Sequence, residues 1–593
     1  MACAAWRCTP LRQRQQLLVV RCNGHHELGT KRNATVPASG RSTSFSRMKP
    51  CQCSVRITGV SLQGTAAMVT ATSGSFIASH WSSINRATFN IDWYLLEHDH
   101  KGDKKCFAVF SLHVHPRKND TSVKNVIGHR WRTFMCMCNQ QRARMSANDA
   151  LLARSLAHVW NPCTQMKQHD TWPMVPIARG EGAWLYDLEG RRYLDAISSW
   201  WVNLFGHCNP RIGGPLSEQL HTLDHVMLAG FTHPPVVELS ERLSALAPRA
   251  SDARLRAGGG PLGHASYGSD GASATEIALK MAFHYWRNRG QPSKQRFIAL
   301  AGSYHGETLG ALSVTDLAVF RDAYAPLLKV PLLVPAPGPA SAMPCCADCT
   351  IDALAALEAA LERCAGSIAA MIVEPLVQGA SGMRMYHPDY LAGARALCTK
   401  HGVLLIADEI MTGMGRTGTM FACEQAGIQP DFLCLSKGIT GGYLPLSVVL
   451  TTDEVYDAFY DDSSARAFLH SHSYTGNPLA CRAALATLDI FAQDDTIVAN
   501  RARSAALTAR AQQIAVHPHV RNFRNLGMIW AFEVDCADPA FGRRLFTAAL
   551  ERELLLRPIG NTVYFMPPYI LDDAQVAHLV DGTLDALNTV LEG

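Results

Sequence analysis

Residues 401–410 have the sequence His401-Gly-Val-Leu-Leu-Ile-Ala-Asp-Glu-Ile410, a short unbroken apolar run that ends in a carboxylate. Branched apolar residues without alternation, as from Val403 to Ala407, are typical of a parallel strand that is buried on both faces. The residue that ends this predicted strand is Asp408. Open parallel sheets bind ligands at the carboxyl ends of their strands, so we expect Asp408 to lie at a ligand site.

A second apolar run, Asp431-Phe-Leu-Cys-Leu435, leads to Lys437, and several glycines soon afterwards leave space around that lysine. Pyridoxal phosphate needs a lysine amine for its covalent attachment. It also needs an acid beside its pyridine nitrogen, so that the ring stays protonated and acts as an electron sink. Asp408 and Lys437 are suited to these two tasks. The alternative for this pair is a helix-capping aspartate and a surface lysine.

The composition is that of a globular protein with a large core. The 593 residues are 48% hydrophobic and 18% charged, which predicts two or more domains. No apolar stretch approaches the roughly 20 residues of a membrane helix, and no signal peptide opens the sequence. The 19 cysteines show no repeating spacing, and the cluster Cys345-Cys-Ala-Asp-Cys349 has no second Cys or His pair at zinc spacing. We therefore expect reduced cysteines, no metal site and a cytoplasmic protein.

The first 144 residues differ in charge from the rest. They hold 21 Lys and Arg against 6 Asp and Glu, whereas residues 145–593 hold 34 against 44. They show no helical or alternating period, so we expect a disordered or non-native N-terminal extension. The favoured explanation is a misassigned start, with Met145 as the true beginning. An organellar transit segment is the alternative. Nucleic-acid binding is less favoured, because no known motif is present.

From about residue 150 the sequence alternates between strands and helices. A β-hairpin is predicted at 182–195, a strand at 369–375, and helices at 351–364 and 388–401. This alternation predicts an α/β fold with a mostly parallel sheet and crossover helices, followed by a smaller α+β domain. We expect residues 145–197 and 491–593 to form the small domain, and residues 198–490 to form the large, cofactor-binding domain.

A loop of small residues leads into a strong helix at Tyr267-Gly-Ser-Asp-Gly-Ala-Ser-Ala. The backbone N–H groups of Gly271, Ala272 and Ser273 and the positive end of the helix dipole predict a phosphate site. The alternative is an ordinary helix cap. The loop has no GxGxxG or Walker pattern, which argues against a dinucleotide or ATP site.

Aromatic residues occur at two further points of interest. Tyr304 follows a predicted strand and is suited to stack on a planar ring. Trp200 and Trp201 are adjacent, and they form either part of the core or a flat apolar wall for a ligand.

With these features in place, residues 150–590 resemble the class III pyridoxal-phosphate aminotransferases. The general signature is Leu405-Ile-Ala-Asp-Glu-Ile410 together with Lys437. More specific matches are Ser198-Ser-Trp-Trp201, Gly379-Ala-Ser-Gly-Met-Arg-Met-Tyr-His-Pro388, Gly476-Asn-Pro-Leu-Ala480, Arg557-Pro-Ile-Gly560 and Met566-Pro-Pro-Tyr-Ile570. They are similar to the branch of the family that aminates 8-amino-7-oxononanoate in biotin biosynthesis with S-adenosylmethionine as donor.

The resemblance implies the type I aminotransferase fold, pyridoxal 5'-phosphate as cofactor, and a homodimer with its sites at the subunit interface. It implies that Lys437 carries the cofactor and shuttles the proton. Asp408 would pair with the pyridine nitrogen, and Tyr304 would lie beside the ring and the substrate. These three are the expected catalytic residues.

The remaining contacts are also carried over by position. Gly271 and Ala272 would hold the cofactor's phosphate, with His472 and Ser473 extending to it from the partner subunit. The residues implied in substrate binding are Trp200, Trp201, Tyr304, Lys437, Ser471, Arg557, Cys163 and Glu307.

Three positions depart from the family pattern. Cys163 stands where a tyrosine is usual, Glu307 replaces an aspartate, and Ser471 replaces a glycine. They bear on substrate affinity and rate more than on reaction type. The alternatives to the donor named above are lysine with the same acceptor, or another class III reaction on ornithine, 4-aminobutyrate or β-alanine. A non-catalytic binding protein is disfavoured, because Asp408 and Lys437 are both retained.

Overall fold

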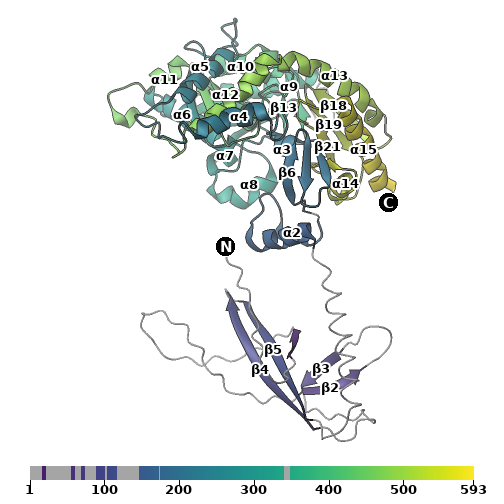
Figure 1. Cartoon of the computed structure of the whole chain (residues 1–593). Coiled ribbons are helices and arrows are strands. Elements are labelled where there is room, and N and C mark those ends of the chain that lie inside the picture. Colours follow the sequence, from purple (N-terminus) through teal and green to yellow (C-terminus); the bar gives the residue numbers. More distant parts are fainter. Residues whose placement is uncertain are drawn as a thin grey trace, which may run out of the picture. The chain divides into compact units, whose positions relative to one another are not determined.

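The computed structural model describes residues 146–172, 174–338 and 347–592, together with five strands nearer the N-terminus (Figure 1). The chain divides into two compact units, Met1–Arg144 and Met145–Gly593. In the first unit β1 (Leu17–Arg21), β5 (Asp103–His115) and β4 (Thr88–His100) form one antiparallel sheet, and β2 (Val55–Val60) pairs with β3 (Val69–Ser73). The prediction that residues 1–144 are a disordered or non-native extension stays a prediction, and Cys345 and Cys346 lie outside the described residues.

The second unit is built on a seven-stranded sheet. Its strand order is β11 (Leu332–Val334), β10 (Arg296–Leu300), β12 (Ile368–Val373), β15 (Leu404–Asp408), β16 (Phe432–Leu435), β17 (Ser447–Thr451) and β9 (His264–Gly268). Neighbouring strands are parallel from β11 to β16, whereas β17 is antiparallel to both its neighbours. The predicted α/β fold with a mostly parallel sheet is confirmed, and β15 ends at Asp408 as expected.

Helices cover both faces of this sheet, which explains why central strands such as β12 and β16 are apolar throughout. In β12, Ile368, Met371 and Val373 belong to one hydrophobic core cluster, whereas Ala369, Ala370 and Ile372 belong to the other. The longer helices of this part are α4 (Pro210–Leu220), α5 (Pro234–Leu246), α6 (Gly271–Asn288), α9 (Ala347–Cys364), α10 (Pro388–His401) and α12 (Pro478–Gln493). Shorter ones are α7 (Leu309–Ser313), α8 (Ala318–Arg321) and α11 (Asp453–Asp457). The predicted helix at 388–401 begins after an N-cap, His387, and ends at Gly402 in the left-handed conformation.

Two smaller sheets complete the second unit, and the first of them combines early and late parts of the chain. The predicted hairpin is confirmed as β7 (Trp184–Asp187) and β8 (Arg192–Asp195), which pair with β6 (Ile177–Glu181) on one side and β20 (Leu554–Leu555) on the other. The second sheet contains β18 (Val520–Leu526), β19 (Ile529–Val534) and β21 (Thr562–Phe565). Figure 1 shows α13 (Thr496–Ala515) and α15 (Asp573–Glu592) beside it, with α14 (Phe541–Leu550) nearby.

The shorter elements are α2 (Ala147–His158), the 3-10 helix η1 (Met166–Asp170), the single turn α3 (Ser198–Trp201), and the strand pair β13 (Val377–Gln378) and β14 (Arg384–Met385). In the part of the chain that the structure describes, every helix is too short or too polar to span a membrane. The domain limits predicted at residues 197 and 490 stay predictions.

Candidate active site

The carboxyl ends of the parallel strands enclose a cavity of about 270 Å³, which we name the inner cavity. It contains most of the residues that the sequence singled out. The predicted residues that line it are Trp201, Gly271, Ala272, Tyr304, Glu307, Asp408 and Lys437. It is also lined by residues to which the sequence analysis gave no role, among them His305, Glu374 and Ile410.

Asp408 is buried at the end of β15 and is held by two donors. Its Oδ2 lies 2.7 Å from Nδ1 of His305, and its Oδ1 accepts a hydrogen bond of 3.1 Å from the backbone N–H of Ile410. His305 is itself buried, and its Nε2 has no hydrogen-bond partner among the described residues. Sequence analysis missed His305, although it directly follows Tyr304 in the loop after β10.

Lys437 follows β16 and has a left-handed backbone, with φ of 47°. Its Nζ lies 4.7 Å from the ring centroid of Trp201. Burial lowers the pKa of this amine from 10.5 to about 8, although the nearby carboxylates of Asp408 and Glu374 act in the opposite direction. A lysine with such a pKa is a much better nucleophile near neutral pH than an exposed one.

Glu374 comes directly after β12 and is a second buried acid at the inner cavity. Its carboxylate accepts hydrogen bonds of 3.0 Å from the backbone N–H groups of Tyr304 and Gly379. Burial raises the pKa of Glu374 to about 7. The sequence carried the same signal as for Asp408, a carboxylate at the end of an apolar run, but it was not used.

The start of α6 corrects one part of the predicted phosphate site. Asp270 caps this helix by accepting hydrogen bonds from the backbone N–H of Ser273 at 3.0 Å and from its hydroxyl at 2.9 Å. The sequence predicted a free N–H at Ser273. This prediction is wrong, because that N–H donates to Asp270. Helix geometry leaves the N–H groups of Gly271 and Ala272 without an intrahelical carbonyl. A side chain at Gly271 would lie 3.0 Å from Ile410, so a glycine keeps this approach open.

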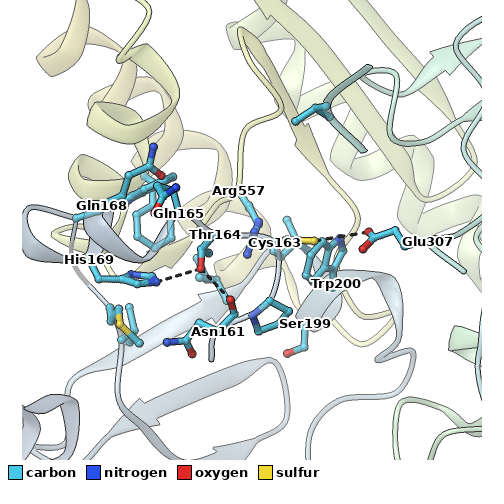
Figure 2. A pocket seen from close by; sticks show the side chains of 18 of the residues that line it. Asn161, Cys163, Thr164, Gln165, Gln168, His169, Ser199, Trp200, Glu307 and Arg557 are labelled. Atoms are coloured by element: carbon cyan, nitrogen blue, oxygen red, sulfur yellow. Dashed lines mark hydrogen bonds between the residues drawn. The ribbon is translucent and has the colours of Figure 1, made fainter. Parts of the chain in front are cut away.

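A larger cavity of about 1010 Å³, the outer cavity, contains Cys163, Trp200, Glu307 and Arg557 (Figure 2). Glu307 lines both cavities and so lies between them. Its Oε1 accepts hydrogen bonds from the Tyr304 hydroxyl at 2.9 Å and from the Cys163 thiol at 3.7 Å. Burial, followed by the charge of Glu307, raises the pKa of both Tyr304 and Cys163, so both groups keep their protons near neutral pH.

Arg557 lies over an aromatic ring in this outer cavity. Its Cζ is 4.5 Å from the ring centroid of Trp200, whose side chain is 40% exposed. The alternative role for an arginine here is an ion pair with a nearby carboxylate. No such ion pair of Arg557 occurs in the described part of the chain. Its guanidinium is thus available to an anionic ligand.

The two tryptophans lie on an unusual turn. Ser198, Ser199, Trp200 and Trp201 have φ of 50°, 46°, 74° and 72°, so four successive residues other than glycine are left-handed. Each such residue costs about 1–2 kcal/mol relative to the right-handed form. The turn directs Trp200 into the outer cavity and Trp201 into the inner one. They therefore do not form the single apolar wall that the sequence suggested.

The structure of one chain does not bring Ser471, His472 and Ser473 to either cavity. They lie in the loop before α12, where the backbone N–H of His472 donates to the Thr475 hydroxyl at 2.9 Å. In residues 146–338 and 347–592, apart from Pro173, no group of three or more His, Cys, Asp or Glu side chains is arranged to hold a metal ion.

Comparisons with known proteins agree with this geometry. The family model "Aminotransferase class-III" matches residues 165–587. The chain is 43% identical over 458 residues to the adenosylmethionine-8-amino-7-oxononanoate aminotransferase of Helicobacter pylori, covering 76% of this chain and 100% of the relative. It is 39% identical to the protein of the same name from Geobacter sulfurreducens, covering 74% and 97%.

Solved structures are similar as well. The adenosylmethionine-8-amino-7-oxononanoate aminotransferase of Methanocaldococcus jannaschii is 32% identical with a TM-score of 0.68, covering 74% of this chain and 99% of that one. An (S)-enantioselective omega-transaminase from Thermomicrobium roseum is 33% identical with a TM-score of 0.70, covering 75% and 100%. An omega transaminase from Pseudomonas jessenii, solved in complex with PMP, is 28% identical with a TM-score of 0.69, covering 74% and 98%.

Proposed function

Because this chain belongs to the class III aminotransferase family, we propose that it transfers the amino group of S-adenosylmethionine to 8-amino-7-oxononanoate, giving 7,8-diaminononanoate in biotin biosynthesis. The protein is a pyridoxal-phosphate-dependent transaminase with the type I aminotransferase fold. The observation that carries the choice of acceptor is Arg557, which lies on Trp200 in the largely apolar outer cavity without a carboxylate partner in the described chain.

The residues of the inner cavity fit pyridoxal phosphate. The glycine at 271 keeps the start of α6 open, as a phosphate requires, and the Nζ of Lys437 is suited to hold the cofactor's aldehyde carbon. Asp408, fixed by His305 and Ile410, supplies a carboxylate for the pyridine nitrogen. When bound, the cofactor supplies an electron sink for the carbon that gains or loses the amino group.

The chain's own side chains move the proton, position the carboxylate of Asp408 and exclude water. Lys437 takes a proton at Nζ from the substrate carbon and returns it, which its lowered pKa of about 8 makes possible near neutral pH. His305 keeps the carboxylate of Asp408 in place. The rings of Trp201 and Tyr304 border the inner cavity and exclude water from the reacting atoms.

The outer cavity suits an acceptor with an apolar chain that ends in a carboxylate. Apolar residues such as Val319 and Phe320 line it together with Arg557. A guanidinium binds a carboxylate through two parallel hydrogen bonds, which an ammonium group does not. We therefore assign the acceptor's carboxylate to Arg557 and its chain to the surface beside Trp200.

The decisive experiment for this proposal is to mix the purified holoenzyme with each candidate donor and follow the cofactor's visible absorbance. Bleaching by S-adenosylmethionine is the expected result. Bleaching by lysine alone, or by ornithine, 4-aminobutyrate or β-alanine alone, would overturn the choice of donor. A protein that no amine bleaches would be a binding protein instead.

Replacing the guanidinium is expected to weaken use of the acceptor. A charge-assisted hydrogen bond contributes about 1.5–3 kcal/mol, so Arg557→Ala should lower acceptor kcat/KM by roughly ten- to a hundredfold. The half-reaction with the donor should be affected less. Stopped-flow measurement of the two half-reactions, each with its own substrate, separates these effects.

Arg192 offers a matched control for that variant. It also lies over a tryptophan, with its Cζ 4.3 Å from the Trp184 ring, but it lines neither cavity. Arg192→Ala should leave both half-reactions at the wild-type rate. If Arg557→Ala kept wild-type acceptor kinetics in a folded protein, Arg557 would have a structural role only.

The pKa of Lys437 also predicts how cofactor capture depends on pH. Only the neutral amine attacks an aldehyde, and with a pKa of about 8 Lys437 is protonated below that pH and neutral above it. The rate at which cofactor-free protein binds pyridoxal phosphate should rise about tenfold per pH unit up to pH 8 and then level off. A rate that keeps rising toward pH 10 would show that the amine is not buried in this way.

We also propose that the protein is a cytoplasmic homodimer with its sites at the subunit interface. Support comes from the loop that carries His472 and Ser473, which lies beside exposed apolar side chains. His225 and Tyr474 are in ring contact, and the large hydrophobic side chains of Met227, Phe231, Leu469 and Tyr474 are 55% to 82% exposed. An exposed apolar surface of this kind is suited to pack against a second copy of the chain. Light scattering that gives a monomer's mass would contradict this.

For the N-terminal part we propose an extension that the catalytic unit does not need. Both hydrophobic core clusters of the described residues consist of residues beyond Met145. A chain that begins at Met145 should fold, bind cofactor and turn over like the full chain, as circular dichroism, absorbance and activity would measure. If this shorter chain failed to fold, residues 1–144 would be part of the enzyme.

A further inference from the structure

Each of the adjacent tryptophans lies against one of the two cations that the proposed mechanism uses. The Nζ of Lys437 is 4.7 Å from the ring centroid of Trp201, and the Cζ of Arg557 is 4.5 Å from that of Trp200. A single turn, Ser198–Trp201, thus supplies the aromatic partner of the cofactor-binding lysine and that of the proposed carboxylate-binding arginine. The interactions that stabilise this turn therefore also determine where Trp201 lies relative to Lys437 and where Trp200 lies relative to Arg557.

The backbone of this turn is not stable on its own. All four of its residues are left-handed and none is a glycine, so the backbone is strained at each position. Backbone hydrogen bonds from Trp201 to Ile197 and from Val202 to Ser198 close it, at 2.8 and 3.0 Å. Strain of this kind persists only where the surroundings over-determine it. The side chains around the turn must therefore contribute.

Asp195 is the main contributor, although it lines neither cavity. This carboxylate is fully buried at the end of β8. It accepts hydrogen bonds from the backbone N–H of Ser199 at 2.9 Å and from the Ser199 hydroxyl at 2.7 Å. A separate bond of 2.7 Å from the Ser198 hydroxyl to the carbonyl of Met566 fixes the beginning of the turn.

A third donor fixes the carboxylate itself. The Nε2 of His207 lies 2.9 Å from Oδ2 of Asp195. The amide oxygen of Asn203 accepts from the N–H of Gly206 at 2.7 Å, so its NH₂ group faces Nδ1 of His207 at 3.2 Å. Nδ1 is therefore the acceptor, and the proton of His207 is on Nε2 and points to Asp195. The positive charge that interacts with the carboxylate of Asp195 is the buried guanidinium of Arg416.

We infer that Asp195 is a positioning residue for both cavities: by holding Ser199 it keeps the left-handed turn that places Trp201 against Lys437 and Trp200 against Arg557. The inference rests on the proposed function for the roles of that lysine and that arginine. Asp195 touches neither substrate nor cofactor, and it acts on acceptor affinity through Trp200 and on the lysine through Trp201.

The substitution Asp195→Asn tests this in the holoenzyme. An asparagine presents an NH₂ group to either Ser199 or His207, and His207 cannot change its tautomer without placing a proton against the Asn203 amide. The turn should relax, and the KM for 8-amino-7-oxononanoate should rise by roughly tenfold, the equivalent of one lost positioning contact. The pH at which the visible absorbance of the bound cofactor titrates should shift as well, because Trp201 leaves Lys437.

Asp187→Asn is the matched control. Asp187 is also buried, at the end of β7 in the same sheet, and it accepts hydrogen bonds from Arg191 and Asn148. This variant should lower the melting temperature but leave the acceptor KM and the absorbance titration unchanged. If both variants changed KM equally, the effect of Asp195 would be one of general stability, and the inference would be wrong.

A second substitution separates an effect on the turn from an effect of charge. Glycine adopts positive φ without side-chain cost, so Ser199→Gly added to Asp195→Asn should restore most of the acceptor KM, although the carboxylate is still absent. No recovery would mean that Asp195 acts by its charge. Should Asp195→Asn not fold, Ser199→Ala removes one of the three bonds, and it should raise the acceptor KM by about threefold; an unchanged KM would overturn the inference.

A measurement without substrate keeps this test apart from the proposed function. Near-ultraviolet circular dichroism of the cofactor-free protein reports the packing of its aromatic side chains, which include Trp200 and Trp201. It should differ between wild type and Asp195→Asn but not between wild type and Asp187→Asn. If the wild-type enzyme did not use S-adenosylmethionine, the proposed function would fail while this comparison still decided the inference.

Discussion

Lys437→Ala is expected to abolish covalent attachment of the cofactor and to lower turnover by about 10³-fold or more, because one amine both holds the aldehyde and moves the proton. The protein should still bind some pyridoxal phosphate, since the start of α6 and Asp408 are unchanged. After denaturation, wild-type protein treated with borohydride should retain the cofactor on one lysine and the variant should not. A small primary amine added to the variant should restore a fraction of the rate.

Lys294 provides the control for a lysine that is buried elsewhere. Its Nζ donates to the carbonyl of Gly402 and lies 3.7 Å from the Trp286 ring, and burial lowers its pKa too. Lys294→Ala should lose stability but keep the covalent cofactor and its turnover. Wild-type turnover in Lys437→Ala would mean that the site has been assigned to the wrong lysine.

Asp408→Asn should keep part of the bound cofactor and lose most of the rate, by about 10²- to 10⁴-fold. An amide does not hold the pyridine nitrogen protonated, so the ring becomes a poor electron sink. The fold should survive, because His305 has a free Nε2 in the described structure to which its proton can move when Nδ1 faces an amide. Single-turnover kinetics with the donor measures the loss directly.

The adjacent acid is the matched control. Glu409 is as buried as Asp408, but its carboxylate accepts hydrogen bonds from the backbone of Ala422 and Cys423 and from Thr412. Glu409→Gln should lower the melting temperature with little effect on the rate per bound cofactor. If the two variants lost activity equally, Asp408 would have no special place beside the ring.

The central sheet and the positions of Asp408 and Lys437 at its strand ends could be predicted from the sequence, because strands buried on both faces have a strong local signature. Val403 to Ala407 alternates between the two core clusters in the structure, which leaves no polar position until Asp408. The apolar run before Lys437 carries the same signal. The hairpin at 182–195 was also predictable, because turn residues separate its two short strands.

Other parts of the site depend on contacts between distant residues and had no local signal. The pair of His305 and Asp408 joins a loop to the end of a strand about 100 residues later in the chain. The left-handed turn at Ser198 contains no glycine, so nothing in its own sequence indicated a positive φ. The N–H of Ser273 was wrongly counted as free, because the capping role of Asp270 was overlooked.

The antiparallel strand β17 has a consequence for how the enzyme is made. Among the described strands, β9, which leads to Gly271, lies at the edge of the sheet and pairs only with β17, about 180 residues later in the chain. At about 5–20 residues per second a ribosome needs roughly 10–35 s to make that stretch. Throughout this interval β9 has an unpaired edge of the kind that aggregates. The proposed phosphate-binding end of the site is thus completed late in synthesis, and we expect that a nascent chain that stops before Ser447 does not capture cofactor.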